Sequence, residues 1–244
     1  ANVSCLGYIG NDKSGNILKN IFKNQNIDCH HLVIEKTPTI EKKRYFSNGT
    51  QILRIDNEEI IQDWKPKSLA KLKMESYDVV ILSDYNKGVL NNDWFKNIKS
   101  HNIIADPKKN DFSFYSNVKI ITPNLNELQR ATKIELKNFS SIKKACQEIL
   151  SKTTLEYIIA KMGEKGMMVV GKNDFFKIID PHLVARPDVT GAGDTVIAAL
   201  SLAYAKFGDI EYSARIANAA ASIAVSKKGT AVVKIEEIEY LLAK

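Results

Sequence analysis

Short aliphatic runs alternate with longer helical stretches over most of this chain, and this alternation restricts its fold more than any other feature. Strands are expected at 78–82, 102–105, 118–121, 157–161, 167–170 and 175–179, and helices at 91–100, 140–150, 191–206, 210–226 and from 235 onward. Strands interleaved with helices predict an α/β fold with a mainly parallel central sheet flanked by helices. Ligands of such folds bind at the carboxyl ends of the strands.

The first third of the chain is expected to add strands at 3–9 and 29–35 and a helix at 13–24. Residues 41–56 contain Asn48-Gly49 between two β-prone runs, which predicts a hairpin and therefore a small β-ribbon. No internal repeat or linker-like stretch interrupts the sequence, so residues 1–244 are predicted to form one domain.

The composition excludes several classes of protein. With 44% hydrophobic and 26% charged residues, the chain matches a folded globular protein and not a disordered or collagen-like one. No apolar run approaches the ~18 residues that a membrane helix needs, so no membrane partner is expected. Cys5, Cys29 and Cys146 are widely spaced, which suits reduced thiols in a cytoplasmic protein better than a disulfide framework or a zinc site.

The net charge of +7 raises the question of a nucleic-acid partner. Only five of the 35 basic residues are arginine, and the lysines are scattered along the chain. Proteins that track a phosphate backbone usually cluster their positive charge on one face or arm. The charge therefore favours anionic small substrates over nucleic acid.

The segment with the most chemical information is 188–195, which reads DVTGAGDT and directly precedes an amphipathic run. Its glycines let the backbone approach a ligand closely, and the N–H groups of the first helical turn form an anion site. A carboxylate here, that of Asp194, has two interpretations. It could cap the helix, or it could take a proton from a hydroxyl that attacks a phosphorus atom held by the loop.

The segment is neither a Walker loop nor a dinucleotide-binding loop after a first strand. It is similar to the second signature of the ribokinase-like (PfkB) carbohydrate kinases. Residues 218–229 resemble the nucleotide-binding helix and following loop of this family, and 1–3 with 10–15 resemble its first signature. The resemblance runs in the correct order from residue 1 to about residue 240.

Within that family the chain looks most like the heptose 7-phosphate kinases of lipopolysaccharide-core precursor synthesis, including the kinase half of the bifunctional heptose enzymes. Residues 82–90 (LSDYNKGVL) resemble their substrate loop, and 38–44 with 51–56 resemble their lid. Two further similar segments are 106–112 (DPKKNDF) and 121–127 (ITPNLNE). The predicted lid spans about 36–56.

The resemblance implies roles for individual residues in catalysis and nucleotide binding. Asp194 would be the general base, and Gly191, Ala192 and Gly193 would form the anion hole. The nucleotide and its hydrated Mg²⁺ would lie near Asn124, Asn126 and Glu127, with Glu127 holding the metal through water. Further nucleotide contacts are expected from Lys161, Gly163, Gly166 and Asn218, and a monovalent-cation site is allowed near Asp188 and Gly229.

Some of these motifs also have plain structural interpretations. Residues 123–127 could be only a turn and a helix cap, and 161–166 could be a hairpin turn between two strands, which does not exclude a nucleotide contact. Asn218 could simply be exposed to solvent on its helix.

For the sugar, Asn2 and Asp84 stand at expected strand ends and could bind hydroxyl groups. The 7-phosphate needs several charge-assisted donors, for which Lys42, Arg44, Arg54 and Lys87 are candidates. Each of these lysines could instead be an ordinary solvated surface residue.

The resemblance implies a cytoplasmic, ATP-dependent kinase that requires Mg²⁺ and phosphorylates O1 of D-glycero-D-manno-heptose 7-phosphate. Family members carry a strand and an acidic sugar contact ahead of the position of Ala1, so a clipped or processed chain is expected. An exposed ribbon often pairs with its twin, which predicts a homodimer. The alternatives are a kinase for another sugar or sugar phosphate, or a sugar-phosphate-binding module without catalysis.

Overall fold

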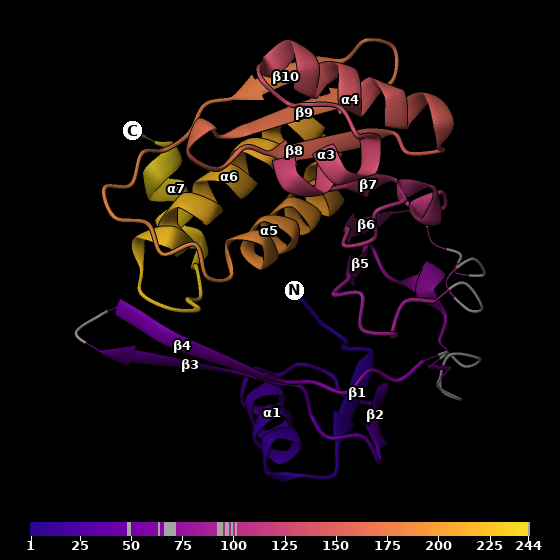
Figure 1. Cartoon of the computed structure of the whole chain (residues 1–244), viewed down its shortest axis with the longest axis vertical. Coiled ribbons are helices and arrows are strands. Elements are labelled where there is room, and N and C mark those ends of the chain that lie inside the picture. The colour runs from indigo at the N-terminus through magenta and orange to yellow at the C-terminus, as the bar shows by residue number, and fades with distance from the viewer. Residues whose placement is uncertain are drawn as a thin grey trace. The chain divides into compact units, whose positions relative to one another are not determined.

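The computed structural model describes residues 1–47, 50–62, 64–65, 72–91, 95, 98, 100 and 102–243 (Figure 1). Two compact units emerge from the contacts between residues, one made of 1–72 with 86–97 and the other of 73–85 with 98–244. The expected turn at Asn48-Gly49 and most of the helix expected at 91–100 lie outside the described residues.

The first unit begins with a β–α–β arrangement in which strand β1 (Gly7–Gly10) pairs in parallel with strand β2 (Leu32–Glu35). Helix α1 (Lys13–Asn24) connects them and has the predicted bounds. Asp12 caps α1 by accepting the Gly15 N–H at 2.7 Å, and the same carboxylate accepts the N–H and hydroxyl of Thr39. The helix start is therefore tied to the segment that enters the ribbon.

Strands β1 and β2 are both shorter than predicted. Residues 3–5 run beside Asp28, but only an isolated bridge between Ser4 and Asp28 forms there. The Asp28 carboxylate accepts the backbone N–H of His30, and the Leu32 N–H donates to the Cys29 carbonyl. Such local side-chain and turn hydrogen bonds take the backbone out of the sheet ladder, so β2 begins at Leu32.

The predicted β-ribbon is confirmed as the antiparallel pair β3 (Glu41–Ser47) and β4 (Thr50–Asn57). In this pair, Lys42 lies opposite Asp56 and Arg44 lies opposite Arg54, and a β-bulge follows Tyr45. Because side chains alternate between the two sides of a strand, these four charged residues share one side of the ribbon. Tyr45, Leu53 and Ile55 lie on the other side, and each is about half exposed.

The second unit is built around a six-stranded sheet in the order β10-β9-β8-β7-β6-β5. The strands are β5 (Val80–Ser83), β6 (Ile103–Asp106), β7 (Ile120–Ile121), β8 (Tyr157–Lys161), β9 (Met167–Gly171) and β10 (Phe176–Ile179). The pairs from β5 to β8 are parallel and the last two pairs are antiparallel. The predicted mainly parallel sheet is thus confirmed.

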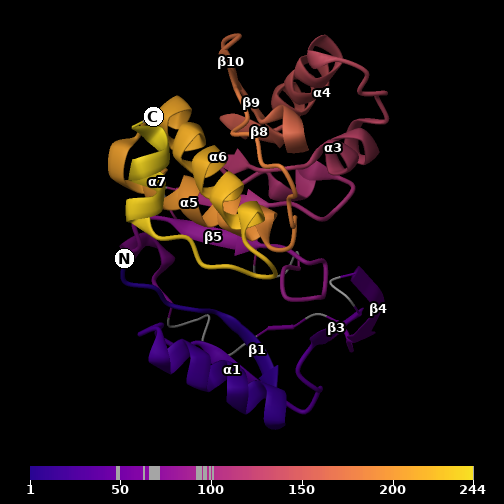
Figure 2. The same ribbon diagram turned by 90° about the vertical axis from the view of Figure 1, so that its left-hand side faces the viewer.

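Helices cover both faces of this sheet. They are α3 (Leu125–Thr132), α4 (Phe139–Lys152), α5 (Ala192–Phe207), α6 (Ile210–Ser226) and α7 (Ile235–Leu242). Figure 2 shows α5, α6 and α7 on one side of the sheet and α3 and α4 on the other. Short 3-10 turns lie at Met74–Ser76, Phe112–Tyr115 and Gly163–Lys165. Helix α3 is longer than the turn and cap that the sequence indicated.

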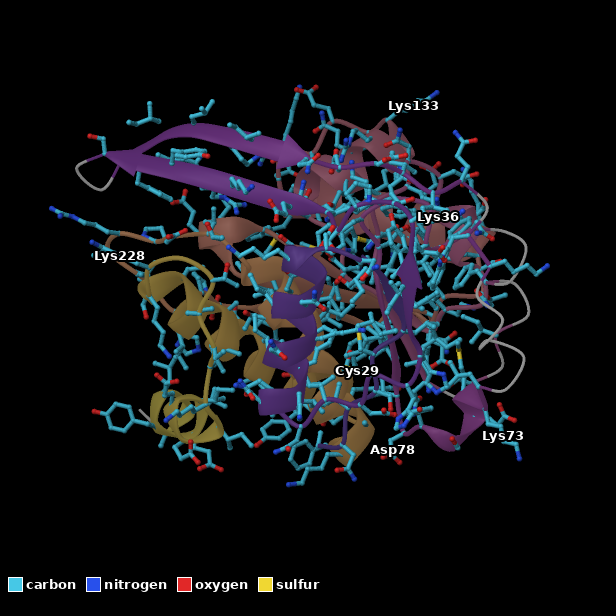
Figure 3. The ribbon with its side chains drawn as sticks, turned by 90° about the horizontal axis from the view of Figure 1, so that it is seen from below. Cys29, Lys36, Lys73, Asp78, Lys133 and Lys228 are labelled. Carbon is cyan, nitrogen blue, oxygen red and sulfur yellow. The ribbon has the colours of Figure 1, made fainter. Side chains whose placement is uncertain are left out.

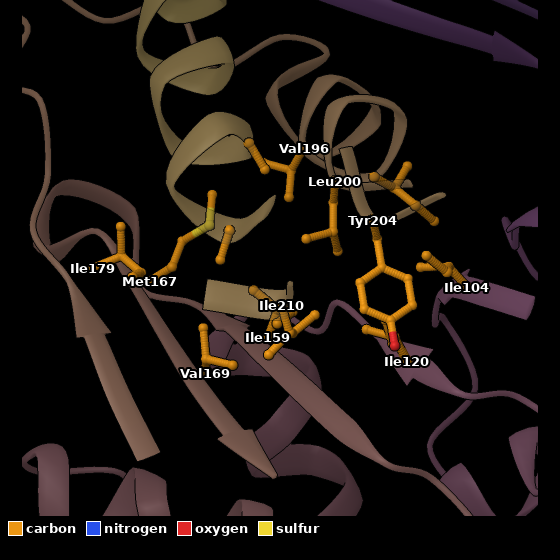
Figure 4. Close-up of a cluster of buried hydrophobic side chains, with 13 residues drawn as sticks. Ile104, Ile120, Ile159, Met167, Val169, Ile179, Val196, Leu200, Tyr204 and Ile210 are labelled. Atoms are coloured by element: carbon orange, nitrogen blue, oxygen red, sulfur yellow. The ribbon is translucent and has the colours of Figure 1, made fainter. Parts of the chain in front are cut away.

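One hydrophobic core cluster of the second unit lies between the sheet and the pair α5–α6 (Figure 4). Ile104, Ile120 and Ile159 rise from three neighbouring strands, and Leu200 of α5 is fully buried against them. The β-branched residues suit the pleated surface of the sheet, whereas small alanines of α6 allow it to pack closely against α5. This packing fixes the N-terminus of α5 near the carboxyl edge of the sheet.

Several lysines stand exposed on separate elements. Figure 3 labels Lys36, Lys73, Lys133 and Lys228, all of which are exposed to solvent.

Among the described residues, no helix has the length and apolar character needed to span a bilayer.

The turn between β8 and β9 confirms the hairpin interpretation of 161–166 and yields a stability prediction. Gly166 has φ +79°, and a Cβ there would lie 2.1 Å from the Ile179 carbonyl oxygen. Gly163 also has positive φ, but a Cβ there would meet nothing within 4 Å. Gly166→Ala should therefore lower the free energy of unfolding by about 2–4 kcal/mol, against about 1 kcal/mol for Gly163→Ala. Urea unfolding measures both, and equal losses would contradict the prediction.

Candidate active site

The N-terminus of α5 carries the motif that the sequence singled out. Gly191 is the N-cap residue, with φ +76° and no side-chain cap hydrogen bond, and Asp194 lies in the first turn. Interpreting Asp194 as the helix cap is therefore wrong, because glycine occupies that position. The carboxylate is exposed at the positive end of the helix, where its charge is favourable.

One oxygen of Asp194 accepts a hydrogen bond from the hydroxyl of Tyr85 at 2.7 Å. Burial and then the Asp194 carboxylate raise the pKa of the Tyr85 hydroxyl. Tyr85 thus remains protonated at neutral pH and acts as a donor. The contact joins the loop after β5 to the start of α5.

A group of four charged side chains lies at the carboxyl edge of the sheet. Asp106 ends β6, and one of its oxygens accepts from Lys161, which ends β8, at 2.5 Å and from the Thr122 hydroxyl at 2.9 Å. Its other oxygen lies 3.3 Å from the ammonium of Lys108, which also donates to Glu127. We call Asp106, Lys108, Glu127 and Lys161 the charged cluster.

The charged cluster is largely withdrawn from water. The side chains of Asp106 and Glu127 are 7% and 4% exposed, that of Lys161 is 13% exposed and that of Lys108 is 31% exposed. Burial alone would lower the pKa of Lys108, but the carboxylates of Asp106 and Glu127 outweigh it and raise that pKa. Lys108 is therefore held as an ammonium.

The charged cluster also adjoins the glycine loop. A Cβ on Gly193 would lie 3.4 Å from the Lys161 ammonium and 3.9 Å from Asp106 Oδ2. Because glycine has no side chain, no Cβ fills the space between the first turn of α5 and the ammonium of Lys161. An anion at this helix terminus would meet both the helical N–H groups and Lys161.

The motif at 124–127 forms a capping box at the start of α3. Asn124 Oδ1 accepts the Glu127 N–H at 2.9 Å, and Glu127 Oε2 accepts the Asn124 N–H at 2.8 Å. The turn-and-cap interpretation is therefore confirmed, while the other oxygen of Glu127 faces Lys108. Asn126 is exposed on α3.

Asp84, expected to bind a sugar hydroxyl, is 3% exposed, and its carboxylate accepts the hydroxyl of Tyr115. Burial, followed by the charge of Asp84, raises the pKa of Tyr115. The Tyr115 oxygen in turn accepts the backbone N–H groups of Lys108 and Lys109. Asp84 thus supports the segment that carries Lys108.

The region suggested for a monovalent cation lies where the loop that contains Asp188 contacts the loop that contains Gly229. Asp188 accepts the N–H groups of Thr190 at 3.1 Å and Gly229 at 2.8 Å. Asn218 is buried, and its amide donates to the Asp180 carbonyl at 2.8 Å. The alternative that Asn218 is merely exposed on its helix is therefore wrong.

Four of the expected phosphate-binding residues belong to the first unit. Lys42 contacts Asp56 and Glu58, Lys87 donates to Glu58 at 2.5 Å, and Arg54 lies 2.9 Å from Asp56. Within the described part of the chain, Arg44 makes no ion pair, although it faces Arg54 across the ribbon. Asn2 is exposed near the N-terminus.

Sequence reasoning missed Tyr85, Asp106, Lys108, Tyr115 and Thr122 as members of the site. A signal existed for two of them. Asp106 ends a buried strand and Thr122 directly follows another, and such ends meet at one edge of a parallel sheet. Tyr115 carried no comparable signal.

Comparison with known proteins adds to this geometry. A family model described as pfkB family carbohydrate kinase matches residues 1–237. The chain belongs to the pfkB family of carbohydrate kinases. Members of such a family are phosphotransferases that act on an alcohol group of a sugar, which agrees with the interpretation of the glycine loop.

Two curated relatives of this pfkB-family chain illustrate its place in the family. It is 36% identical to the bifunctional protein HldE of Sulfurimonas denitrificans over 98% of this chain and 52% of the relative. It is 34% identical to the bifunctional protein HldE of Helicobacter pylori over 99% of this chain and 55% of the relative. The chain spans about half the length of the curated relatives it matches.

Solved structures establish the fold. Ribokinase from Thermotoga maritima is similar with a TM-score of 0.80 and 21% identity, covering 99% of this chain and 81% of that one. Arabidopsis thaliana ribokinase complexed with ribose and ATP has a TM-score of 0.79 and 20% identity, covering 99% of this chain and 82% of that one. The predicted ribokinase-like fold is confirmed.

The ion pair between Lys161 and Asp106 yields a prediction. Removal of one partner from a buried pair leaves the other charge poorly compensated. Lys161→Met should lower the free energy of unfolding by about 3 kcal/mol at neutral pH. Lys165→Met, an exposed change in the same turn, should stay within about 0.5 kcal/mol of the parent. Urea denaturation of both variants distinguishes them, and a small loss for Lys161→Met would show that the pair contributes little.

Proposed function

We propose that this chain is an ATP-dependent kinase that phosphorylates O1 of D-glycero-D-manno-heptose 7-phosphate, giving the 1,7-bisphosphate used for lipopolysaccharide-core precursors. The main supporting observation is the position of Asp194 in the first turn of α5, directly after Gly193, which lies beside the ammonium of Lys161. This arrangement supports a role for Asp194 as a base next to a site for a transferring phosphoryl group.

In the proposed reaction, Asp194 accepts the proton of the sugar O1 hydroxyl, and O1 forms a bond to the γ-phosphorus of ATP. The bond from that phosphorus to the bridging oxygen breaks, and ADP leaves. The loop at Gly191, Ala192 and Gly193 and the α5 N-terminus stabilise the charge on the transferring group. Tyr85 holds one Asp194 oxygen, which orients the carboxylate.

The donors near Glu127 fit a hydrated Mg²⁺. Mg²⁺ prefers oxygen ligands and keeps several of its waters, so one or two carboxylates together with phosphates suffice. In the described part of the chain, no three His, Cys, Asp or Glu side chains are grouped to hold a metal directly. We propose that Glu127 would hold Mg²⁺ through water, and that the ion would neutralise phosphate charge.

For the nucleotide, the proposal uses the residues around the turn and the C-terminal helices. Lys161 would pair with a phosphate beside Gly193, and Asn124 and Asn126 at the start of α3 would lie near the phosphates. Gly163, Gly166 and Asn218 would contribute to the floor of the nucleotide site, and Asp188 with Gly229 would flank a monovalent cation. The Asp188–Gly229 hydrogen bond supports the pairing of those two loops.

The ribbon supports a phosphorylated sugar. Arg44 and Arg54 are directly opposite each other, and like charges in this position destabilise a sheet. A dianion accepting from both guanidinium groups would remove the repulsion, with Lys42 and Lys87 nearby as further donors. Asn2 and Asp84 would bind sugar hydroxyl groups.

Two observations support heptose as the sugar. The loop at 82–90 contains the Ser-Asp-Tyr-x-Lys-Gly string of the heptose 7-phosphate kinases, and HldE proteins are about one-third identical over nearly the whole chain. We further propose that the chain acts in the cytoplasm, with the ribbon as a lid. The exposed side chains of Tyr45, Leu53 and Ile55 would pair with a second copy in a homodimer.

A coupled ADP-release assay with Mg·ATP tests the function against a panel of heptose 7-phosphate, fructose 6-phosphate, fructose and ribose. Turnover with the heptose phosphate alone is expected. Turnover with another panel member would instead identify a different sugar kinase. Ligand binding without any turnover would identify a non-catalytic binding module.

The base assignment predicts that Asp194→Asn lowers kcat by about 10³-fold or more, because an amide cannot accept the proton. ATP binding, measured by calorimetry, should persist. Asp209→Asn is a matched control, since it removes the same charge from the N-terminus of α6 and asparagine caps helices equally well. Retained turnover in Asp194→Asn would contradict the assignment.

The phosphate assignment predicts that Arg44→Met raises KM for the sugar phosphate by about tenfold, the value of one charge-assisted hydrogen bond, and leaves KM for ATP unchanged. Lys43→Met is the control, because Lys43 lies on the other side of the same strand and pairs with Glu41. Steady-state kinetics measure both variants. Equal changes would mean that the ribbon acts only through its net charge.

A further inference from the structure

Lys108 links the two acidic members of the charged cluster. Its ammonium donates to Glu127 Oε1 and lies 3.3 Å from Asp106 Oδ2. It is the one side chain among the described residues that contacts both carboxylates. One cation therefore bridges Glu127 and Asp106, and Asp106 Oδ2 lies 3.9 Å from the position of a Cβ on Gly193.

The remaining oxygens of these carboxylates have other partners. Glu127 Oε2 accepts the Asn124 N–H, and Asp106 Oδ1 accepts from Lys161 and the Thr122 hydroxyl. The oxygen of Glu127 that a metal or its water could approach is thus the one that Lys108 occupies.

The two lysines differ in how easily they can leave. Lys161, which pairs with Asp106, is 13% exposed, whereas Lys108 is 31% exposed and is therefore the one with more access to solvent. With both lysines in place, two carboxylates face two ammonium groups and the charged cluster is neutral. A neutral cluster attracts a divalent cation much less than one with a net negative charge.

We propose that Lys108 is a resident counter-ion which occupies the position of the divalent cation on Glu127 while nucleotide is absent and is displaced when the metal arrives. The inference rests on the role of Glu127 in the proposed function. It explains how two carboxylates remain buried without a metal, since a buried charge without a partner is costly. The bound nucleotide would attract the metal with its own phosphates, and a phosphate would pair with the displaced ammonium.

Mn²⁺ binding to the nucleotide-free protein tests this proposal without any turnover. Free Mn²⁺ is followed by its electron paramagnetic resonance signal during a titration. Lys108→Met should bind Mn²⁺ about tenfold more tightly than the parent, because a unit positive charge beside the metal position is gone. Lys108→Arg, which keeps the charge, should bind as weakly as the parent.

Lys109→Met is the matched control. It removes the same charge from the adjacent residue, whose ammonium lies over the Phe114 ring at 4.5 Å and not between Asp106 and Glu127, and should change the affinity by about twofold at most because charge interactions weaken with distance. In the double variant Lys108→Met with Glu127→Gln, the gain should disappear. Circular dichroism checks that each variant is folded, and Lys108→Gln replaces Lys108→Met if the latter does not fold.

Unchanged Mn²⁺ affinity in Lys108→Met, or equal gains in Lys108→Met and Lys109→Met, would overturn the proposal. The proposed function fails by a different result, the absence of turnover on the sugar panel. Each can therefore fail without the other.

Discussion

The candidate site depends on the carboxylate of Asp106. It receives the ammonium of Lys161 from β8 and the hydroxyl of Thr122 after β7, and it shares Lys108 with Glu127 of α3. It also lies under the first turn of α5, where Gly193 leaves room. One buried charge thus ties four elements of the second unit together. Because such a charge requires partners, the geometry of the carboxyl edge is strongly specified.

Elements with local signals at their ends could be predicted from the sequence. Helices α1 and α6 have the predicted bounds, and aspartates at positions 12 and 209 cap both of them. Strand β8 also has its predicted bounds, since it ends at a glycine turn. Strands β1 and β2 were overestimated because the hydrogen bonds of Asp28 to its neighbours are not visible in a hydrophobic pattern.

Site residues that belong to a local sequence motif could be predicted. Contacts between side chains that are far apart in the sequence could not. Asp194 was found because the glycine loop precedes it, but its partner Tyr85 is 109 residues away in the chain. Lys161 and Asp106 are 55 residues apart, and although each ends a strand, neither segment indicates that these two side chains pair. Only the order of strands in the sheet brings these groups together.

The pairing of Arg44 with Arg54 across the two strands has a consequence for the ribbon itself. Cross-strand pairs are the main stabilising contacts of a two-stranded sheet, and here one pair joins two like charges, of which only Arg54 has an acidic partner, Asp56, among the described residues. An anion that screens this pair would strengthen the hydrogen-bonded ladder around it. The local stability of β3 and β4 would then be linked to the concentration of the anion, so the ribbon would exchange its amide hydrogens more slowly in its presence.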